Sequence, residues 1–429
     1  MDLPGAVFCN SHASLRRGPG RILSAEFSGR PGVPEPGGPG TVWYNQPILP
    51  GERLLNTGPS YDPAIADALG RGRRVARELL APRAEESDQA AVPPAENVRA
   101  LAVEGLLGLN VPRAYGGLGA LGAALREHTE TLAAACGVTT FVQGQHQSAC
   151  AFISAGASEP IKERLLPPMA TGDLLGAVAF SHLRRPGPPA VRATPVAGGF
   201  VLDGTAPWVT GWGLMRVAVM GGTLPDDRLL YAVIPLEESE HLCASPPMRL
   251  CAMSASATVA VTLRGLFVPE TEVLKTITRE QMAATDAGAI LLVTPQPFGV
   301  TRASIALLRD LADRRDRALF RQVAETLERE LEEVRARTEH WIGRTTDPDY
   351  AASALSIRAW AVELGVRAAH AALAASGGSG NALDHPAQRL VRESVFYTLV
   401  AQTSSVQAAV LQRLRDRSWH PGGGDGAPT

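Results

Sequence analysis

Two short stretches of the sequence hold residue types that could do chemistry. GGSG, at positions 377–380, has glycine at three of its four positions, so its backbone could approach a phosphate closely and adopt positive φ angles. The same four residues also occur in ordinary loops. His146, in QGQHQSACAFI, carries an imidazole that can act as an acid or a base near neutral pH. The alternative for His146 is a histidine whose hydrogen bonds are satisfied between two packed helices.

Several other chemistries have no motif in this sequence. No GxGxxG follows a strand-like run, and no GxxxxGK[ST], HExxH or GxSxG occurs. Rossmann-type dinucleotide binding, P-loop hydrolysis, zinc-protease and α/β-hydrolase catalysis therefore have no support. The five cysteines are scattered, without a CxxC pair, and predict neither a disulfide framework nor a zinc site. A formal net charge of -2 provides no general attraction for nucleic acid or for an anionic membrane.

The elements that must position these residues are predicted from the period of the apolar residues. Apolar residues recur at intervals of three and four in the first part of the chain and again after about residue 278, and this spacing favours helices in both parts. Between them, short β-branched or alternating runs separated by Gly, Pro and Asp are typical of antiparallel strands. We expect a mainly helical chain with a β insert: an N-terminal helical domain at 56–172, a central antiparallel β domain at 173–277, and a C-terminal four-helix-bundle domain at 278–417.

The two ends of the chain have a different composition. Residues 1–55 are rich in Gly and Pro without apolar periodicity, so we expect a disordered arm, or an arm that closes over a neighbouring subunit. Residues 418–429 are expected to form a disordered tail. No run of about 18 apolar residues predicts a membrane span, and the start lacks the order of a signal peptide. We therefore expect a cytoplasmic protein.

The order of helical, β and helical blocks, with PRAYGGLGA closing the first helical pair, resembles the acyl-CoA dehydrogenase superfamily of flavoproteins. The corresponding stretch of that family is close to VPxxYGGLG, and the resemblance covers roughly residues 60–415. It implies the three-domain fold of the superfamily and an FAD cofactor, with FMN possible. It also implies a homodimer or homotetramer.

The resemblance assigns three residues of the β domain to the flavin. The stretch LLGAVAFSHLRRPG supplies Ser181, where the family has a hydroxyl that hydrogen-bonds the flavin. APWVTGWG supplies Trp208 and Thr210, which match a WxT motif that packs on the isoalloxazine ring. A planar indole against a planar ring is a physically sensible cradle. The alternative for Trp208 is an aromatic residue at the end of a strand.

The resemblance also assigns residues to the adenosine end of FAD. GGSG is followed by HPAQRLVRES, as the family's GGxG turn is followed by a YPxxRxxRDA run, and that turn often acts across a dimer. It implies cofactor contacts for Gly377, Gly378 and Gly380. Arg315 falls where the family's arginine reaches the pyrophosphate, although the Phe-Gly that completes the motif is missing. A solvated helix charge is the alternative for Arg315.

The catalytic base of the family is absent. Ala401, in VAQTS, falls where most family dehydrogenases carry a glutamate in a motif like YEGTS, while Thr403 is retained as a flavin contact. That glutamate takes the α-proton of an acyl thioester, and a general base of this kind contributes roughly 10² to 10⁴ in rate. Some members carry the base on an earlier helix, where the position looks like Ala289. The only carboxylate of that segment, DAGAILLVTPQPFG, is Asp286, which is therefore the candidate for a displaced base.

The thioester side of the family's site also differs. SHLRRPGPP replaces a TEPxAGSD stretch, so that His182 stands for the acidic residue and Gly187 for the serine. Flavin monooxygenases of the same fold resemble this chain in having a histidine at the position of His146 and no glutamate base. The leading hypothesis is a flavin-dependent oxidoreductase acting on a CoA or carrier-protein thioester, or on a related small molecule. The alternatives are a reduced-flavin-dependent monooxygenase and a catalytically silent flavin-binding or structural member of the family.

Overall fold

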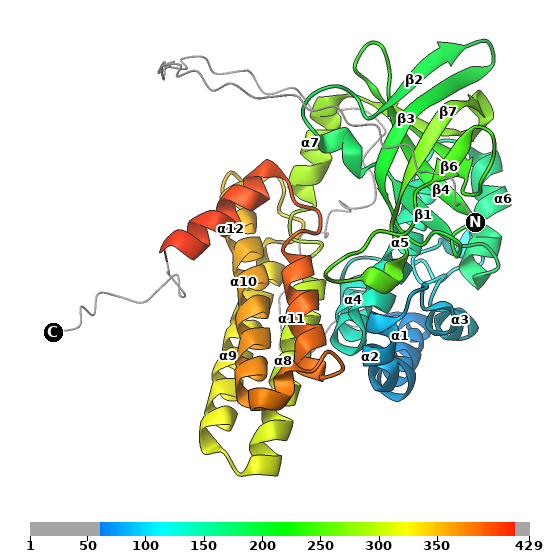
Figure 1. Cartoon of the computed structure of the whole chain (residues 1–429). Coiled ribbons are helices and arrows are strands. Elements are labelled where there is room, and N and C mark those ends of the chain that lie inside the picture. The colour runs from blue at the N-terminus through cyan, green and yellow to red at the C-terminus, as the bar shows by residue number, and fades with distance from the viewer. Residues whose placement is uncertain (1–60, 417–429) are drawn as a thin grey trace, which may run out of the picture. The chain divides into compact units, whose positions relative to one another are not determined.

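The structure, a computed structural model, describes residues 61–416. The arm predicted at 1–55 and the tail predicted at 418–429 lie outside the described residues. The predicted order of a helical region, a β region and a helical region is confirmed (Figure 1). Within the described part of the chain, none of the helices combines the length and the apolarity that a bilayer span requires.

From residue 61 onward, where the structure describes the chain, the N-terminal region contains six α-helices. Asp62 caps the first of them by accepting a hydrogen bond from the backbone N–H of Ala64, and a proline follows at the first helical position. A π-helical turn, Ala76–Leu80, continues that helix. The six helices are α1 (Pro63–Val75), α2 (Ala84–Gln89), α3 (Ala95–Val103), α4 (Gly122–Ala135), α5 (Gly137–Ser154) and α6 (Glu159–Thr171).

The β region forms one twisted sheet with the strand order β6-β7-β3-β2-β4-β5-β8, to which β1 is added beside β4. The pairing is antiparallel as expected, except that β1 runs parallel to β4 and β2 meets β4 in parallel at one residue pair. The strands are β1 (Gly176–Ala179), β2 (Val191–Val196), β3 (Gly199–Val209), β4 (Val217–Thr223), β5 (Leu229–Pro235), β6 (Leu242–Ala244), β7 (Val259–Pro269) and β8 (Val273–Ile277).

The C-terminal region is a helical bundle around a long central helix. Helix α10 packs against α8, α9, α11 and α12 (Figure 1). Its Trp360 is 1% exposed and belongs to the bundle core. The indole N–H of Trp360 donates to the Glu330 carboxylate at 2.6 Å, which satisfies this buried donor. The helices are α7 (Arg279–Gly288), α8 (Pro295–Arg315), α9 (Ala318–Trp341), α10 (Tyr350–Ser376), α11 (Pro386–Tyr397) and α12 (Ser404–Asp416).

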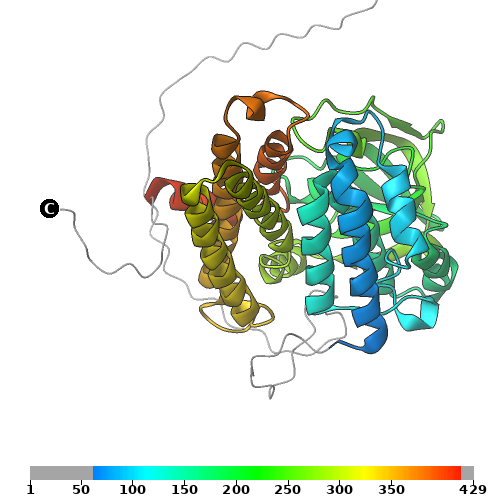
Figure 2. The ribbon, with the colours of Figure 1, turned by 90° about the horizontal axis from the view of Figure 1, so that it is seen from below.

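The bundle and the N-terminal helices lie side by side in Figure 2, and buried contacts at Gly299 and at Glu393 are among those that join them. Helix α8 approaches α4 at Gly299, where a Cβ would lie 2.6 Å from the Cβ of Ala133 and 2.7 Å from the backbone N of Ala134. Helix α11 carries Glu393, whose carboxylate accepts hydrogen bonds from the first N–H of α5, at Gly137 (2.9 Å), and from Arg389 (2.9 Å). Glycine at position 299 allows α8 to approach α4 closely, and the buried carboxylate of Glu393 links α11 to α5.

One buried histidine of the N-terminal region has no hydrogen bond, and it supports a stability prediction. His128 on α4 packs against Gly72 of α1, and neither ring nitrogen has a partner among the described residues. Burial lowers the pKa of His128 from 6.5 to about 4. Between these two pH values the unfolded chain binds a proton that the folded chain does not, so stability falls by about 1.4 kcal/mol per pH unit as the pH drops.

We therefore expect His128→Leu to raise the free energy of unfolding at pH 7 by about 1 to 3 kcal/mol, because an unpaired buried polar group is removed. The gain should be larger at pH 5, since the variant lacks the proton-linked loss. Urea unfolding at both pH values measures it. His146→Leu is the matched control and should destabilise, because both nitrogens of His146 are hydrogen-bonded. A loss of stability in the His128 variant at pH 7 would contradict the prediction.

Candidate functional site

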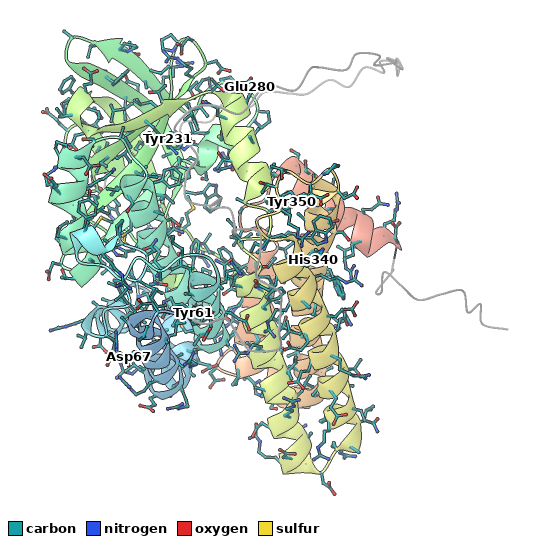
Figure 3. All side chains as sticks on the ribbon, turned by 180° about the vertical axis from the view of Figure 1, so that it is seen from behind. Tyr61, Asp67, Tyr231, Glu280, His340 and Tyr350 are labelled. Atoms are coloured by element: carbon teal, nitrogen blue, oxygen red, sulfur yellow. The ribbon has the colours of Figure 1, made fainter. Side chains whose placement is uncertain are left out.

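A cavity of about 2770 Å³ lies between the N-terminal helices and the bundle. Its walls come from α4 and α5 on one side and from α8, its preceding segment and α9 on the other. Tyr61 and His340, which are labelled in Figure 3, line it from these two sides. The close approach of α4 and α8 at Gly299 therefore sets the distance between its walls.

The α5 wall of the cavity is polar rather than apolar. Gln143, Gln147 and Ser154 all line the cavity, and their spacing of four and seven residues places them on one face of the helix. Gly144 and Ala151 lie on the same wall and leave room, since a Cβ at Gly144 would meet nothing within 4 Å. The sequence-based predictions did not include this stripe, although the polar residues of QGQHQS were a visible signal.

Each carboxylate that lines the cavity is paired with an arginine. The five ion pairs are Glu127–Arg73, Glu130–Arg302, Glu328–Arg309, Glu332–Arg335 and Glu339–Arg126. Asp286 is also paired: both of its oxygens accept hydrogen bonds from Arg184 at 2.7 Å, and it does not line the cavity. Among the described residues, the cavity wall therefore offers no unpaired carboxylate as a base.

Ala401 lies in the loop between α11 and α12, which a buried arginine ties to the cavity wall. Its φ of 47° is left-handed, and its side chain is exposed. Arg358 of α10, only 1% exposed, donates to the carbonyl oxygens of Val400 at 3.0 Å and Val293 at 2.9 Å. Val293 lines the cavity, so Arg358 holds the Ala401 loop beside that wall. Burial lowers the pKa of Arg358 to about 10, which leaves it charged at neutral pH.

His146 does not reach the cavity. Its Nε2 lies 3.1 Å from the carbonyl oxygen of Met169, and its Nδ1 accepts a hydrogen bond from the backbone N–H of Gly176 at 3.3 Å. The imidazole is fully buried on the face of α5 that meets α6 and β1, and burial lowers its pKa to about 4. These contacts are those of a histidine that joins packed elements, so we assign His146 no catalytic role.

The β-domain residues assigned to the flavin occupy neighbouring elements. Ser181 begins the 3₁₀ turn Ser181–Arg184, which packs against β3, and it is exposed. Trp208, near the end of β3, keeps 45% of its surface exposed, which is unusual for an indole. Thr210 is buried, and its hydroxyl lies 3.0 Å from that of Thr258. A half-exposed indole on β3 and an exposed hydroxyl on the turn that packs against this strand are groups that fit a planar, hydrogen-bonding ring.

The structure brings Arg315 and the GGSG turn together. The guanidinium of Arg315 donates to the carbonyl oxygens of Ala375 at 2.9 Å and Ser376 at 3.2 Å, directly before the turn. Gly377 has a φ of 67°, and a Cβ at Gly377 would meet nothing within 4 Å. Gly380, by contrast, is buried, and a Cβ there would lie 2.9 Å from the side chain of Leu373. A ligand could therefore approach the backbone of the turn at Gly377, whereas Gly380 is packed against the protein.

Thr403 and the Arg315–GGSG group, which the resemblance assigns to the same cofactor, lie at opposite ends of α8. Thr403 belongs to the loop that Arg358 ties to Val293, just before α8 begins, whereas Arg315 is the last residue of α8. A helix of 21 residues is about 30 Å long. One chain therefore separates the Arg315–GGSG group from the Thr403 loop by roughly the length of this helix.

Comparisons with known proteins agree with this architecture. The family model for the acyl-CoA dehydrogenase N-terminal domain matches residues 69–173. The chain is 24% identical over 366 residues to the probable acyl-CoA dehydrogenase YngJ of Bacillus subtilis, covering 79% of this chain and 94% of that relative. It is 25% identical over 368 residues to the mitochondrial isovaleryl-CoA dehydrogenase of Solanum tuberosum, covering 79% and 87%.

Solved structures show the same fold. Butyryl-CoA dehydrogenase from Megasphaera elsdenii superposes with a TM-score of 0.71 at 18% identity, covering 84% of this chain and 100% of that one. Dibenzothiophene monooxygenase TdsC from Paenibacillus sp. A11-2 gives a TM-score of 0.69 at 17% identity, covering 82% and 97%. With the family match over the N-terminal helices and the similarity to these relatives, the structures show that this chain has the fold of the acyl-CoA dehydrogenases.

Proposed function

We propose that this protein is a flavin-dependent oxidoreductase that acts on an acyl thioester or a related small molecule. The observation that carries the proposal is the half-exposed indole of Trp208 near the end of β3, the strand against which the Ser181 turn packs. The relatives named as acyl-CoA dehydrogenases support the same class of enzyme. We expect FAD as the cofactor, with FMN as the alternative.

In this proposal the side chains hold and orient the flavin. Trp208 and Ser181 would hold the flavin, the first through its half-exposed indole and the second through its exposed hydroxyl. Thr258 holds the hydroxyl of the buried Thr210 in place, two residues after Trp208. A bound flavin supplies the electron-transfer chemistry, which no side chain of the chain can supply.

The Arg315–GGSG group is proposed to serve a flavin bound by a second copy of the chain. The separation of about 30 Å along α8 supports this, because it places the group far from the Thr403 loop of the same chain. The open backbone at Gly377 and Gly378 leaves room for a phosphate or a nucleoside. The proposed assembly is therefore a homodimer or a homotetramer.

A second candidate is a reduced-flavin-dependent monooxygenase. Every carboxylate that lines the cavity is paired with an arginine, and position 401 carries alanine. Both observations favour a monooxygenase, because a monooxygenase does not need a carboxylate to remove an α-proton. Its support does not include His146, which lies away from the cavity. If the protein neither oxidises an acyl thioester nor oxygenates a small molecule, the third alternative, a catalytically silent member of the family, is supported.

The first test is the visible spectrum of the purified protein with and without added FAD. About one flavin per subunit supports the proposed function, and failure to take up FAD or FMN moves the silent alternative to first place. Anaerobic bleaching of bound flavin by an acyl-CoA supports the dehydrogenase. Consumption of oxygen by the chemically reduced holoprotein, with oxygenation of an added small molecule and no bleaching by acyl-CoA, supports the monooxygenase.

We expect Trp208→Ala to weaken FAD binding by about tenfold or more, because the buried area and the aromatic contact are both lost. Titration followed by flavin fluorescence measures the change. Phe267→Ala is the matched control, since Phe267 is another exposed aromatic of the same sheet, at 50% exposure on β7. Equal affinities for the wild type and the Trp208 variant would exclude the proposed cradle.

A further inference from the structure

We infer that the substrate group that enters the cavity is uncharged and hydrogen-bonding, a chain that carries hydroxyl or amide groups rather than a plain hydrocarbon chain. The inference rests on the proposed function, in that the substrate is taken to be an acyl thioester. It is carried by polar side-chain atoms of the cavity wall that have no hydrogen-bond partner among the described residues.

Five residues of the cavity wall each have a buried polar side-chain atom without a hydrogen-bond partner in the described part of the chain. They are Asn110 (Oδ1), Gln143 (Nε2), Gln147 (Nε2), Ser154 (Oγ) and Gln296 (Oε1). The first four are at most 9% exposed. Because buried polar groups in folded proteins nearly always have partners, five unpaired ones around a single cavity point to a ligand that pairs with them.

The polar groups of α5 fall into two kinds. The hydroxyl of Ser148 donates to the carbonyl oxygen of Gly144 at 2.8 Å, so it is satisfied within the helix. The amides of Gln143 and Gln147 form no side-chain hydrogen bond with any described residue. The Nδ2 of Asn110 donates to the backbone oxygen of Gln147 at 2.8 Å, which fixes this amide while leaving its oxygen unpaired.

The charges of the wall argue for a neutral ligand. Each lining glutamate is paired with an arginine, and each lining arginine with a glutamate. The unpaired hydrogen-bonding capacity is therefore that of amides and one hydroxyl, which both donate and accept. From Gln143 to Ser154 the helix extends about 16 Å, so an elongated ligand would meet these groups in succession.

The test uses four N-acetylcysteamine thioesters of similar length, carrying heptanoyl, 6-hydroxyhexanoyl, adipamoyl and adipoyl groups. Their affinities for the FAD-loaded full chain are measured by isothermal titration calorimetry. We expect the hydroxyl and amide probes to bind at least about tenfold more tightly than the heptanoyl and adipoyl probes. Equal or tighter binding of heptanoyl or adipoyl, or no binding of any probe, would overturn the inference.

The double variant Gln143→Met/Gln147→Met separates a ligand-binding role from a structural one. We expect the preference for the polar probes to disappear while the thermal midpoint stays the same or rises, because the amides contribute no hydrogen bond to the fold. Ser148→Ala, on the same wall, is the matched control and should keep the preference. A double variant with a lower midpoint and an unchanged preference would show that bound water, not a ligand, satisfies the amides, and would overturn the inference.

The outcomes also separate this inference from the proposed function. A protein that takes up one FAD per subunit but binds the heptanoyl probe as tightly as the polar probes retains the proposed function and loses the inference. A protein that takes up no flavin, yet binds the polar probes preferentially, loses the proposed function and retains the polar cavity.

Discussion

Ala401→Glu is expected to give the protein an acyl-CoA oxidation activity about 10² to 10⁴ times that of the wild type, measured as anaerobic bleaching of its bound flavin. The physical reason is that the loop carrying residue 401 is held in place by Arg358, which binds the carbonyl oxygens of Val400 and Val293. A carboxylate placed there would start from a loop fixed beside the cavity wall. It would also be free of an arginine partner supplied by that wall, whose arginines are already paired.

The control for this experiment is Ala401→Gln, which has nearly the same size and cannot take a proton. Both substitutions meet the same backbone strain, since residue 401 has a φ of 47°. A gain shared by both variants would show that the activity does not come from a new base. Should no acyl-CoA of any chain length bleach the glutamate variant, the proposal of an acyl thioester substrate would be wrong.

Glu393→Ala is expected to lower the free energy of unfolding by about 3 to 5 kcal/mol, because it removes one partner of a buried charge network. The carboxylate of Glu393 is 1% exposed and pairs with Arg389, which also binds Glu85 of α2. It accepts the N–H of Gly137 at the start of α5 as well. Its loss leaves a buried guanidinium with one remaining partner and a helix terminus without its acceptor.

Urea unfolding of the variant measures this effect. Glu78→Ala is the matched control, because Glu78 is 57% exposed and pairs with Arg77 on the surface, where an ion pair contributes about 0 to 1 kcal/mol. The double variant Arg389→Met/Glu393→Leu should recover part of the loss, since no unpaired charge remains buried. A Glu393 variant within about 1 kcal/mol of the wild type would contradict this account of the joint between the helical regions.

The cavity wall illustrates what a periodic pattern does and does not predict. The spacing within QGQHQSACAFIS predicts a helix, and α5 covers this stretch. Among its residues, His146 is a catalytic candidate by residue type, because an unperturbed imidazole titrates near neutral pH. Which face of α5 meets the cavity depends on how the helix packs against α6 and β1, and that packing turns His146 inward and Gln143 and Gln147 toward the ligand space.

The arginines show the same limit. Arg315 was assigned by position alone, and its partners, Ala375 and Ser376, lie about 60 residues further along the chain. Arg358, in LSIRAWAVEL, was visible as a charge within an apolar helix, but its three carbonyl partners come from two other segments. Sequence spacing predicts which residues are neighbours within one helix or strand. The contacts of Arg315 and Arg358 join segments that are far apart in the sequence, so spacing does not predict them.

The sequence by itself determined the order of helical, β and helical regions, because the period of apolar residues changes from helical to strand spacing and back within one chain. It also determined that position 401 carries no acid, since that is a matter of residue identity. Only the tertiary structure decided that every lining carboxylate has an arginine partner and that Arg315 lies beside the GGSG turn. It also decided that the Nε2 atoms of Gln143 and Gln147 lack a hydrogen-bond partner among residues 61–416. Those features arise where distant segments meet, and the meeting is set by packing across the whole fold rather than by local pattern.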